Sequence, residues 1–176
     1  LQKNLVEKIK KIIPNVTIYN GYGPSETMIF STVADVTNQS EITIGKPIHN
    51  TQIYILNKNK KILPQGNIGE MYISGDGVGK GYMHKEQQTK ENFIQNPFLD
   101  GKIMYKVGDL GEFDENGEIT CHGRIDNQVK IRGLRIELQE IEKRIQPVYN
   151  IADCAVVKKV VKGKDALCAY YVENGH

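Results

Sequence analysis

The sequence has no tryptophan, only three cysteines and no long apolar run among its 176 residues. Cys121, Cys154 and Cys168 lie far apart without a Cys-x-x-Cys pair. This spacing is neither a disulfide framework nor a zinc site, and it predicts a reducing compartment, the cytoplasm. No run approaches the roughly 18 apolar residues of a membrane span. The formal net charge is only +2, so we expect neither nucleic acid nor a membrane as a partner.

The composition is that of a globular protein, with 39% hydrophobic and 25% charged residues. Apolar residues at positions 1, 5, 9 and 12 predict an amphipathic helix over 1–13, which Pro14 ends. Leu1 is not a methionine and lies where this helical pattern is already under way. We therefore expect the chain to be a fragment of a longer protein.

Short β-branched and aromatic runs dominate the middle of the chain. Strands are predicted at 16–19, 28–36, 51–56, 70–74, 102–107, 110–113 and 119–122, with one helix at 86–93. Such short strands at close intervals are typical of a small β-barrel or a strongly bent sheet.

The pattern changes near Arg124. Two strands, at 128–131 and 134–136, flank Arg132-Gly133; a helix carrying Leu138, Ile141 and Ile145 follows, and strands at 152–161 and 166–172 come last. A strand pair, a helix and two more strands make a compact α+β unit. We place a boundary within 123–127, which divides this α+β chain into 1–125 and 126–176.

Residues 19–26, YNGYGPSE, concentrate unusual chemistry in one turn. Glycines let backbone N–H groups approach an anion, the Ser25 hydroxyl can bind phosphate, and the Glu26 carboxylate can hold Mg²⁺. The ring of Tyr22 can stack on a base. The alternative is a tight turn between strands in which Glu26 is merely exposed.

Three further segments allow both a functional and a structural interpretation. GDGVGKGY, residues 75–82, has four glycines but lacks the lysine followed by a hydroxyl residue of a P-loop, which favours a structural turn. YKVGDL, residues 105–110, predicts Asp109 at an exposed bend, where it either caps a turn or accepts hydrogen bonds from two sugar hydroxyls. GRIDNQVKIRGLRIEL, residues 123–138, predicts either a polar hairpin face or a cationic surface for phosphate or carboxylate.

In this order and spacing, the four segments resemble the adenylate-forming superfamily, most closely the amino-acid adenylation domains of nonribosomal peptide synthetases. The matching stretches are NGYGPSE (20–26), GEMYISGDGVGKGY (69–82), YKVGDL (105–110) and GRIDNQVKIRGLRIEL (123–138). The resemblance implies that 1–125 is the β-barrel-like, C-terminal part of a large subdomain and that 126–176 is an incomplete small subdomain. It also implies an ATP-dependent ligase that uses Mg²⁺ to form an aminoacyl-adenylate. The aminoacyl group then passes to the phosphopantetheine thiol of a peptidyl carrier domain, and neighbouring synthetase domains are the other expected partners.

The resemblance implies a role for each matching residue. Tyr22 would lie against adenine, Asp109 would bind ribose and Glu26 would hold Mg²⁺. The implied nucleotide-binding positions are Asn20, Gly21, Tyr22, Gly23, Ser25, Asp109 and Arg124, and the implied amino-acid pocket includes Gly21, Ile29 and Phe30.

Two residues of the second unit are implied to act in the catalytic cycle. Asp126 matches the family's hinge, about which the small subdomain swings between adenylation and thioester formation. Lys130 matches a lysine brought toward the active site in the thioester-forming state. A hinge absorbs its rotation over a few backbone dihedrals, which suits 125–127.

The chain also departs from the family pattern. Cys121 stands where an aromatic residue is usual, and Ser25 stands where threonine is usual. The glycine-rich phosphate loop upstream and the lysine near the C-terminus of the domain are not in the chain, so we expect the isolated fragment to be inactive. Two alternatives remain open: a fragment of a D-alanine–carrier-protein ligase or acyl-CoA synthetase, and a non-catalytic module that docks a carrier protein.

Overall fold

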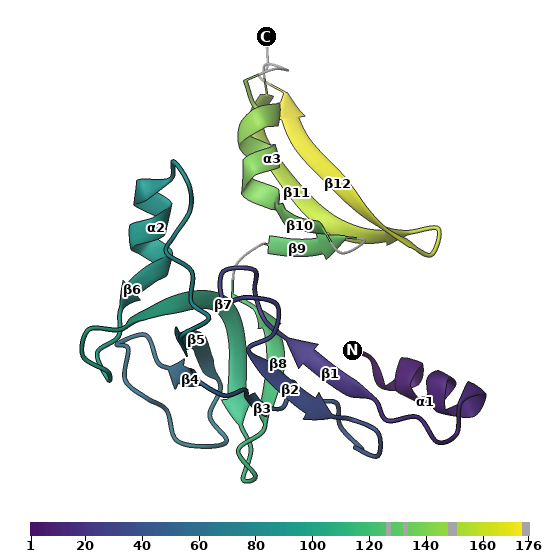
Figure 1. Cartoon of the computed structure of the whole chain (residues 1–176). Coiled ribbons are helices and arrows are strands. Elements are labelled where there is room, and N and C mark those ends of the chain that lie inside the picture. The colour runs from purple at the N-terminus through teal and green to yellow at the C-terminus, as the bar shows by residue number, and fades with distance from the viewer. Residues whose placement is uncertain (126–127, 132–133, 148–150, 174–176) are drawn as a thin grey trace. The chain divides into compact units, whose positions relative to one another are not determined.

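The computed structural model describes residues 1–125, 128–131, 134–147 and 151–173, and it divides the chain into two compact units, Leu1–Ile125 and Asp126–His176 (Figure 1). The first unit is mostly short strands with two helices, and the second is α+β. In the part of the chain that the structure describes, none of the helices is long and apolar enough to span a membrane.

A curled sheet, a half-barrel of five strands, forms the centre of the first unit (Figure 1). Its strands are β4 (Thr51–Leu56), β5 (Gly69–Gly75), β6 (Phe93–Gln95), β7 (Ile103–Phe113) and β8 (Ile119–Arg124). β7 pairs with β5 on one edge; on the other edge its start pairs with β6 and its end with β8. The bent sheet expected from the sequence is therefore present, and its inner face buries most of the core of this unit.

β7 is one continuous strand, so the two separate strands predicted at 102–107 and 110–113 were wrong. The strand passes through Gly108, whose φ of 78° lies in the left-handed region that suits glycine. The register shifts on both edges of β7 near this point, a pattern typical of a β-bulge. The bulge bends the strand without ending it, which curls the sheet.

A smaller sheet carries the YNGYGPSE turn. It consists of β1 (Tyr19–Tyr22), β2 (Thr32–Asp35) and β3 (Lys46–Pro47), all antiparallel. The strand expected at 16–19 therefore lies three residues later, and the first half of the turn motif is itself a strand. Two backbone hydrogen bonds join this sheet to the larger one, Ile44 N–H to the Ile119 carbonyl oxygen (2.8 Å) and Ile119 N–H to the Gly45 carbonyl oxygen (2.9 Å).

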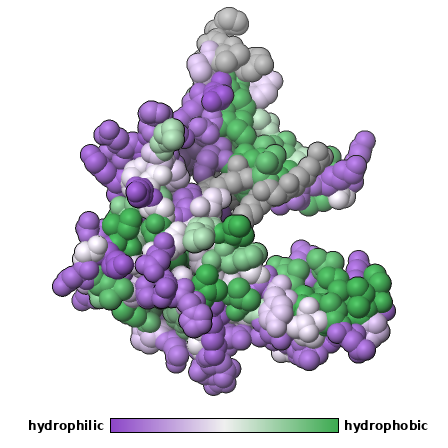
Figure 2. All heavy atoms as spheres, viewed as in Figure 1, coloured by the Kyte–Doolittle hydropathy of each residue, from purple (hydrophilic) through white to green (hydrophobic). Residues whose placement is uncertain are grey.

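The helix expected over 1–13 is α1 (Lys3–Ile12), but the predicted apolar stripe is not its buried face. Val6, which is outside the stripe, is buried with Ile18, Ala34 and Val36, and of the stripe positions Ile9 packs against this cluster. Leu1, Leu5 and Ile12, three of the four stripe positions, are exposed in this unit, and apolar surface gathers over α1 (Figure 2).

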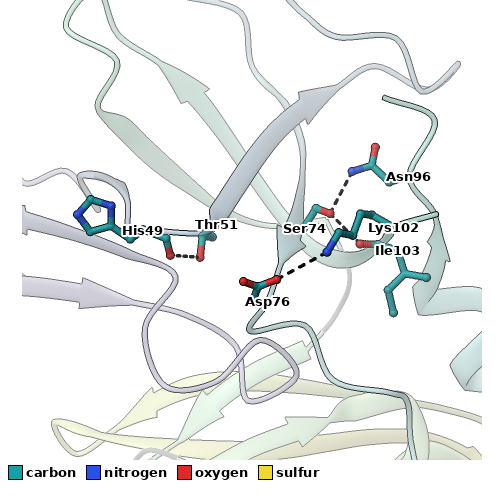
Figure 3. Close-up of polar contacts among 7 residues, drawn as sticks. All are labelled: His49, Thr51, Ser74, Asp76, Asn96, Lys102 and Ile103. Carbon is teal, nitrogen blue, oxygen red and sulfur yellow. Dashed lines mark hydrogen bonds and ion pairs between the residues drawn. The ribbon is translucent and has the colours of Figure 1, made fainter. Parts of the chain in front are cut away.

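A buried polar cluster fixes the end of the sheet from which the glycine-rich segment leaves (Figure 3). The Ser74 hydroxyl donates to the Ile103 carbonyl oxygen at 2.8 Å and accepts from the Asn96 amide at 3.0 Å. Asp76 pairs with Lys102 at 3.7 Å beside them. The helix α2 (Glu86–Asn92), expected at 86–93, follows the glycine-rich segment.

The second unit contains a hairpin, a helix and a long strand pair. The hairpin is β9 (Gln128–Ile131) with β10 (Leu134–Glu137), and the helix is α3 (Leu138–Ile145). The strand pair is β11 (Ile151–Val161) with β12 (Lys164–Glu173). α3 packs on β11 around Leu138. All five elements were expected from the sequence to within a few residues.

Gly45 holds the two sheets of the first unit together and tolerates no side chain. Its φ is 80°, and an added Cβ would lie 2.0 Å from the Val33 carbonyl oxygen. Gly45→Ala therefore combines a left-handed backbone penalty of roughly 1–2 kcal/mol with a steric cost of roughly 1–3 kcal/mol. We expect a loss of about 3 kcal/mol in the free energy of unfolding, measured in urea.

The matched control is Gly66→Ala. Gly66 has a similar φ of 76° with nothing within 4 Å of an added Cβ. The Gly66→Ala variant should therefore lose only the left-handed backbone penalty, roughly 1–2 kcal/mol, from its free energy of unfolding. Equal losses in the two variants would contradict the steric argument.

Candidate active site

The YNGYGPSE motif leaves β1 at Tyr22 and returns to β2 through a compact turn. Ser31 N–H donates to the Tyr22 carbonyl oxygen at 2.7 Å, and the buried hydroxyls of Thr27 and Ser31 lie 2.7 Å apart. Gly23 is required here because an added Cβ would lie 2.8 Å from the Ser31 nitrogen. The closed turn leaves Ser25 exposed and Glu26 half-buried.

Asp109 is held by two side chains from different strands. Its Oδ2 accepts a short hydrogen bond from the Tyr22 hydroxyl, and its Oδ1 lies 3.1 Å from Arg124 Nη1. Asp109 and Arg124 are directly opposite in the β7–β8 ladder, and Tyr22 ends β1. The structure thus brings together three implied nucleotide-binding positions that are distant in sequence.

The exposed bend predicted for Asp109 was wrong. Asp109 lies inside β7 and only 9% of its surface is exposed, because the strand continues through Gly108. A carboxylate offers about four acceptor positions, and these two contacts use one on each oxygen. The Asp109 carboxylate therefore has acceptor capacity beyond these two contacts.

Tyr22 is the neutral donor of this group. Burial, reinforced by the neighbouring Asp109 charge, raises the pKa of the Tyr22 hydroxyl far above its usual value near 10. The proton therefore stays on the phenol at physiological pH, and Tyr22 donates it toward the carboxylate. Arg124 supplies the positive charge that offsets Asp109.

Glu26 belongs to a second group, at an open pocket of about 410 Å³. Its Oε1 accepts a hydrogen bond of 2.7 Å from the Tyr82 hydroxyl, which lies 3.3 Å from the Tyr105 hydroxyl. Desolvation on burial, aided by Tyr105 and Glu26, raises the pKa of Tyr82 far above its usual value. The pocket is lined by Ser25, Glu26, Met28, Gly77, Gly79, Gly81, Tyr82 and Phe93.

Three amides of the glycine-rich segment donate hydrogen bonds within the protein. Gly79 N–H donates to the Glu26 carbonyl oxygen at 2.8 Å, and Val78 N–H donates to the Gly75 carbonyl oxygen at 3.2 Å. Tyr82 N–H donates to Thr89 Oγ1 at 2.9 Å. These amides are engaged within the protein, so the glycines serve to bring the loop against the YNGYGPSE turn.

The remaining residues of the turn lie outside both polar groups. The Asn20 side chain donates to the Thr43 carbonyl oxygen at 2.6 Å, and the Phe30 ring lies over Gly21, where an added Cβ would come within 2.5 Å of it. Phe30 and Ile29 are 52% and 77% exposed. An exposed apolar pair beside Gly21 is compatible with the wall of a pocket for an apolar side chain.

Three other positions complete the comparison with the sequence analysis. Cys121 is half-buried against the core cluster that Tyr22 also contacts. Asp126 lies outside the described residues. Lys130 lies on β9, in register with Arg135, but its side chain is outside the description as well.

Sequence reasoning missed Tyr82 and Tyr105 as members of the Glu26 group. Tyr82 ends the glycine-rich segment and Tyr105 begins YKVGDL, but neither position is marked by charge or by metal-ligand chemistry. An aromatic residue directly after a glycine-rich loop was the available signal. Among the described residues no cluster of three or more His, Cys, Asp or Glu side chains could hold a metal by protein ligands alone.

Comparisons with known proteins were made on both sequence and fold. A family model described as AMP-binding enzyme matches residues 1–83. Over 99% of its length the chain is 46% identical to bacitracin synthase 3 of Bacillus licheniformis, and over 95% it is 43% identical to tyrocidine synthase 3 of Brevibacillus parabrevis. The chain spans only 3% of the length of each of these two relatives.

Solved structures agree with the sequence relatives. The chain is similar to PA1221, an NRPS protein containing adenylation and PCP domains, with a TM-score of 0.85 and 28% identity over 99% of this chain and 36% of that one. It is also similar to AB3403, a four-domain nonribosomal peptide synthetase solved with AMP and glycine bound. There the TM-score is 0.63 and the identity 35%, over 97% of this chain and 13% of that one.

The raised pKa of Tyr22 predicts a loss of stability in alkaline solution. A phenol whose pKa is raised on folding contributes stability that is complete below about pH 10, the usual pKa of tyrosine, and that is lost as the pH rises above it. The free energy of unfolding should therefore fall above pH 10. Tyr22→Phe should make this fall shallower and should cost about 2 kcal/mol at neutral pH, because the lost hydrogen bond is made to a charged carboxylate.

Urea unfolding between pH 8 and pH 11 measures both effects. Part of the fall should persist in Tyr22→Phe, because burial also raises the pKa values of Tyr72 and Tyr82. An unchanged pH dependence in Tyr22→Phe would show that the Tyr22 proton is not held by the folded protein.

Proposed function

Because the chain belongs to the AMP-binding enzyme family and is similar along nearly its whole length to segments of peptide synthetases, we propose that it is part of an amino-acid adenylation domain. In this proposal the complete domain joins an amino acid to ATP, giving an aminoacyl-adenylate and pyrophosphate. It then passes the aminoacyl group to the phosphopantetheine thiol of a carrier domain. The chain contributes one wall of the active site and the start of the small subdomain.

The observation that carries the proposal is the convergence of Tyr22, Asp109 and Arg124. A partly enclosed carboxylate with acceptor positions to spare suits a pair of ribose hydroxyls, as acidic residues do in other nucleotide sites. Its two protein partners fix its orientation before any ligand arrives, so little is lost on ordering it. Arg124 places positive charge beside the same group, where a nucleotide phosphate can also use it.

Glu26 suits the role of a Mg²⁺ ligand. It is a carboxylate at the wall of an open pocket, with the exposed Ser25 hydroxyl next to it. Mg²⁺ is usually bound through one or two carboxylates together with water and substrate phosphates, so a dedicated cluster of protein ligands is not needed. When bound, the ion would offset the negative charge on the phosphates as the carboxylate of the amino acid approaches.

The residues of the chain then act by binding and orientation. Ser25 donates its hydroxyl to phosphate, Tyr22 presents its ring beside the base, and Asp109 holds the ribose. Phe30 and Ile29 form an apolar contact for the amino-acid side chain. Such positioning, rather than covalent catalysis by the protein, is the usual contribution to transfer at phosphorus.

The second unit is proposed to rotate between adenylation and thioester formation, the two half-reactions. We place the subdomain boundary at 125–126, with Asp126 as the hinge and Lys130 as the lysine that reaches the active site during thioester formation. The division of the structure into Leu1–Ile125 and Asp126–His176 supports the position of this boundary.

The test of the proposed function is pyrophosphate exchange into ATP by the complete adenylation domain, with a panel of amino acids. One or a few amino acids should stimulate exchange, whereas the 176-residue chain alone should show none. D-Alanine and fatty acids belong in the panel, because exchange with either alone would favour a carrier-protein ligase or an acyl-CoA synthetase. Absence of both exchange and ATP binding in the complete domain would favour a non-catalytic docking module.

Asp109→Ala in the complete domain tests the ribose contact. Loss of two hydroxyl contacts should raise the KM for ATP by roughly 30-fold to 150-fold, at about 1–1.5 kcal/mol per hydrogen bond, and should leave the KM for the amino acid nearly unchanged. Initial rates of exchange at varied ATP measure both constants.

The matched control is Glu112→Ala, which removes another carboxylate of β7 that faces a β8 side chain, His122, at 3.5 Å. This variant should retain the wild-type KM for ATP. Similar KM changes in the two variants would indicate damage to the β7–β8 ladder instead of a lost ribose contact.

A further inference from the structure

Tyr82 is held in place from three directions. Its backbone N–H donates to Thr89 Oγ1 of α2 at 2.9 Å. Its ring meets Phe93 edge to face, with centroids 5.4 Å apart and an interplanar angle of 78°. Its hydroxyl lies 3.3 Å from that of Tyr105 on the central strand β7. The phenol oxygen therefore has a defined position at the wall of the pocket.

From that position the Tyr82 hydroxyl donates to Glu26 Oε1 at 2.7 Å, across 56 residues of sequence. The same loop also contacts the backbone of Glu26, because Gly79 N–H donates to its carbonyl oxygen at 2.8 Å. The glycine-rich loop thus fixes Glu26 by its main chain and by its carboxylate.

Close approach of the loop depends on the absence of side chains. An added Cβ at Gly79 would lie 3.2 Å from the Glu26 carbonyl oxygen, and one at Gly81 would lie 2.3 Å from Thr89 Cγ2. Gly81 also has a φ of 131°, which other residues rarely adopt. These glycines let Tyr82 reach both Thr89 and Glu26.

Carboxylates that bind metals are usually hydrogen-bonded by an outer partner, and loss of that partner typically costs tenfold to a hundredfold in metal affinity or activity. We propose that Tyr82 is a positioning residue whose hydroxyl holds the Glu26 carboxylate in the orientation that binds Mg²⁺. This inference rests on the proposed function. It adds a role for the glycine-rich loop, which acts on the metal through Tyr82.

Tyr82→Phe in the complete adenylation domain tests the inference, because phenylalanine keeps the ring that packs on Phe93 and removes only the donor. The Mg²⁺ concentration for half-maximal pyrophosphate exchange should rise about tenfold. The KM for the amino acid should stay within twofold of wild type. Binding of Mn²⁺ in the presence of ATP, followed by electron paramagnetic resonance of the free ion without turnover, should weaken by the same factor.

The matched control is Tyr72→Phe. The Tyr72 hydroxyl donates a hydrogen bond to Glu70 at 2.9 Å on β5, and neither residue lines the pocket. This variant therefore removes an equivalent Tyr–Glu hydrogen bond away from the proposed metal site. Its half-saturating Mg²⁺ concentration and Mn²⁺ binding should equal those of wild type. Equal changes in Tyr72→Phe and Tyr82→Phe would overturn the specific role of Tyr82.

Glu26→Gln separates failure of this inference from failure of the proposed function. Absence of pyrophosphate exchange in the wild-type domain would contradict the proposed function itself. With an active wild type, normal metal dependence in Glu26→Gln would overturn the Mg²⁺ assignment and the role of Tyr82 with it. A metal defect in Glu26→Gln together with normal behaviour of Tyr82→Phe would overturn the role of Tyr82 alone.

Thr89→Val provides a second route if Tyr82→Phe does not fold. Valine keeps the shape of the side chain but removes the acceptor for Tyr82 N–H. The half-saturating Mg²⁺ concentration should rise about threefold. This change is smaller than in Tyr82→Phe because the Tyr82 hydroxyl is retained. An unchanged Mg²⁺ dependence and unchanged Mn²⁺ binding would count against the inference.

Discussion

The bulge at Gly108 in β7 is the constraint on which the first unit depends. Because the strand bends there without ending, its first half pairs with β6 and its second half with β8, while β5 covers the other edge. The same strand carries Tyr105 to Tyr82 and Asp109 to Arg124. A strand that ended at Gly108 would leave the half-barrel open and would separate the two polar groups.

In both polar groups, around Asp109 and around Glu26, a tyrosine hydroxyl stabilises the carboxylate. A carboxylate near the protein interior is costly unless it is hydrogen-bonded. Asp109 accepts a hydrogen bond from the Tyr22 hydroxyl, and Glu26 accepts one from the Tyr82 hydroxyl. Desolvation raises the pKa of each phenol, so each tyrosine remains a neutral donor and the charge stays on the acid. The two acids are thus oriented by the protein before a nucleotide or metal arrives.

Local patterns predicted most of the elements, and long-range contacts account for the misses. The hairpin over 128–137, the helix α3 and the strand β4 follow from short-range periodicity, and the structure confirms them. The strand β1 was placed three residues too early because its Asn-Gly pair has poor strand propensity, yet pairing with β2 holds it extended. The buried face of α1 was also missed, since which apolar residues are covered depends on the sheet behind them.

By itself the sequence determined the family, the order of the motifs and the chemistry available at each position, because these depend on residue types and on spacing along the chain. Only the tertiary structure decided that Asp109 is enclosed instead of exposed, that its partners are Tyr22 and Arg124, and that Tyr82 contacts Glu26. These facts arise from strand pairing and loop packing between segments far apart in sequence. Residue spacing does not predict such contacts, because burial and hydrogen-bond geometry are defined only in the folded chain.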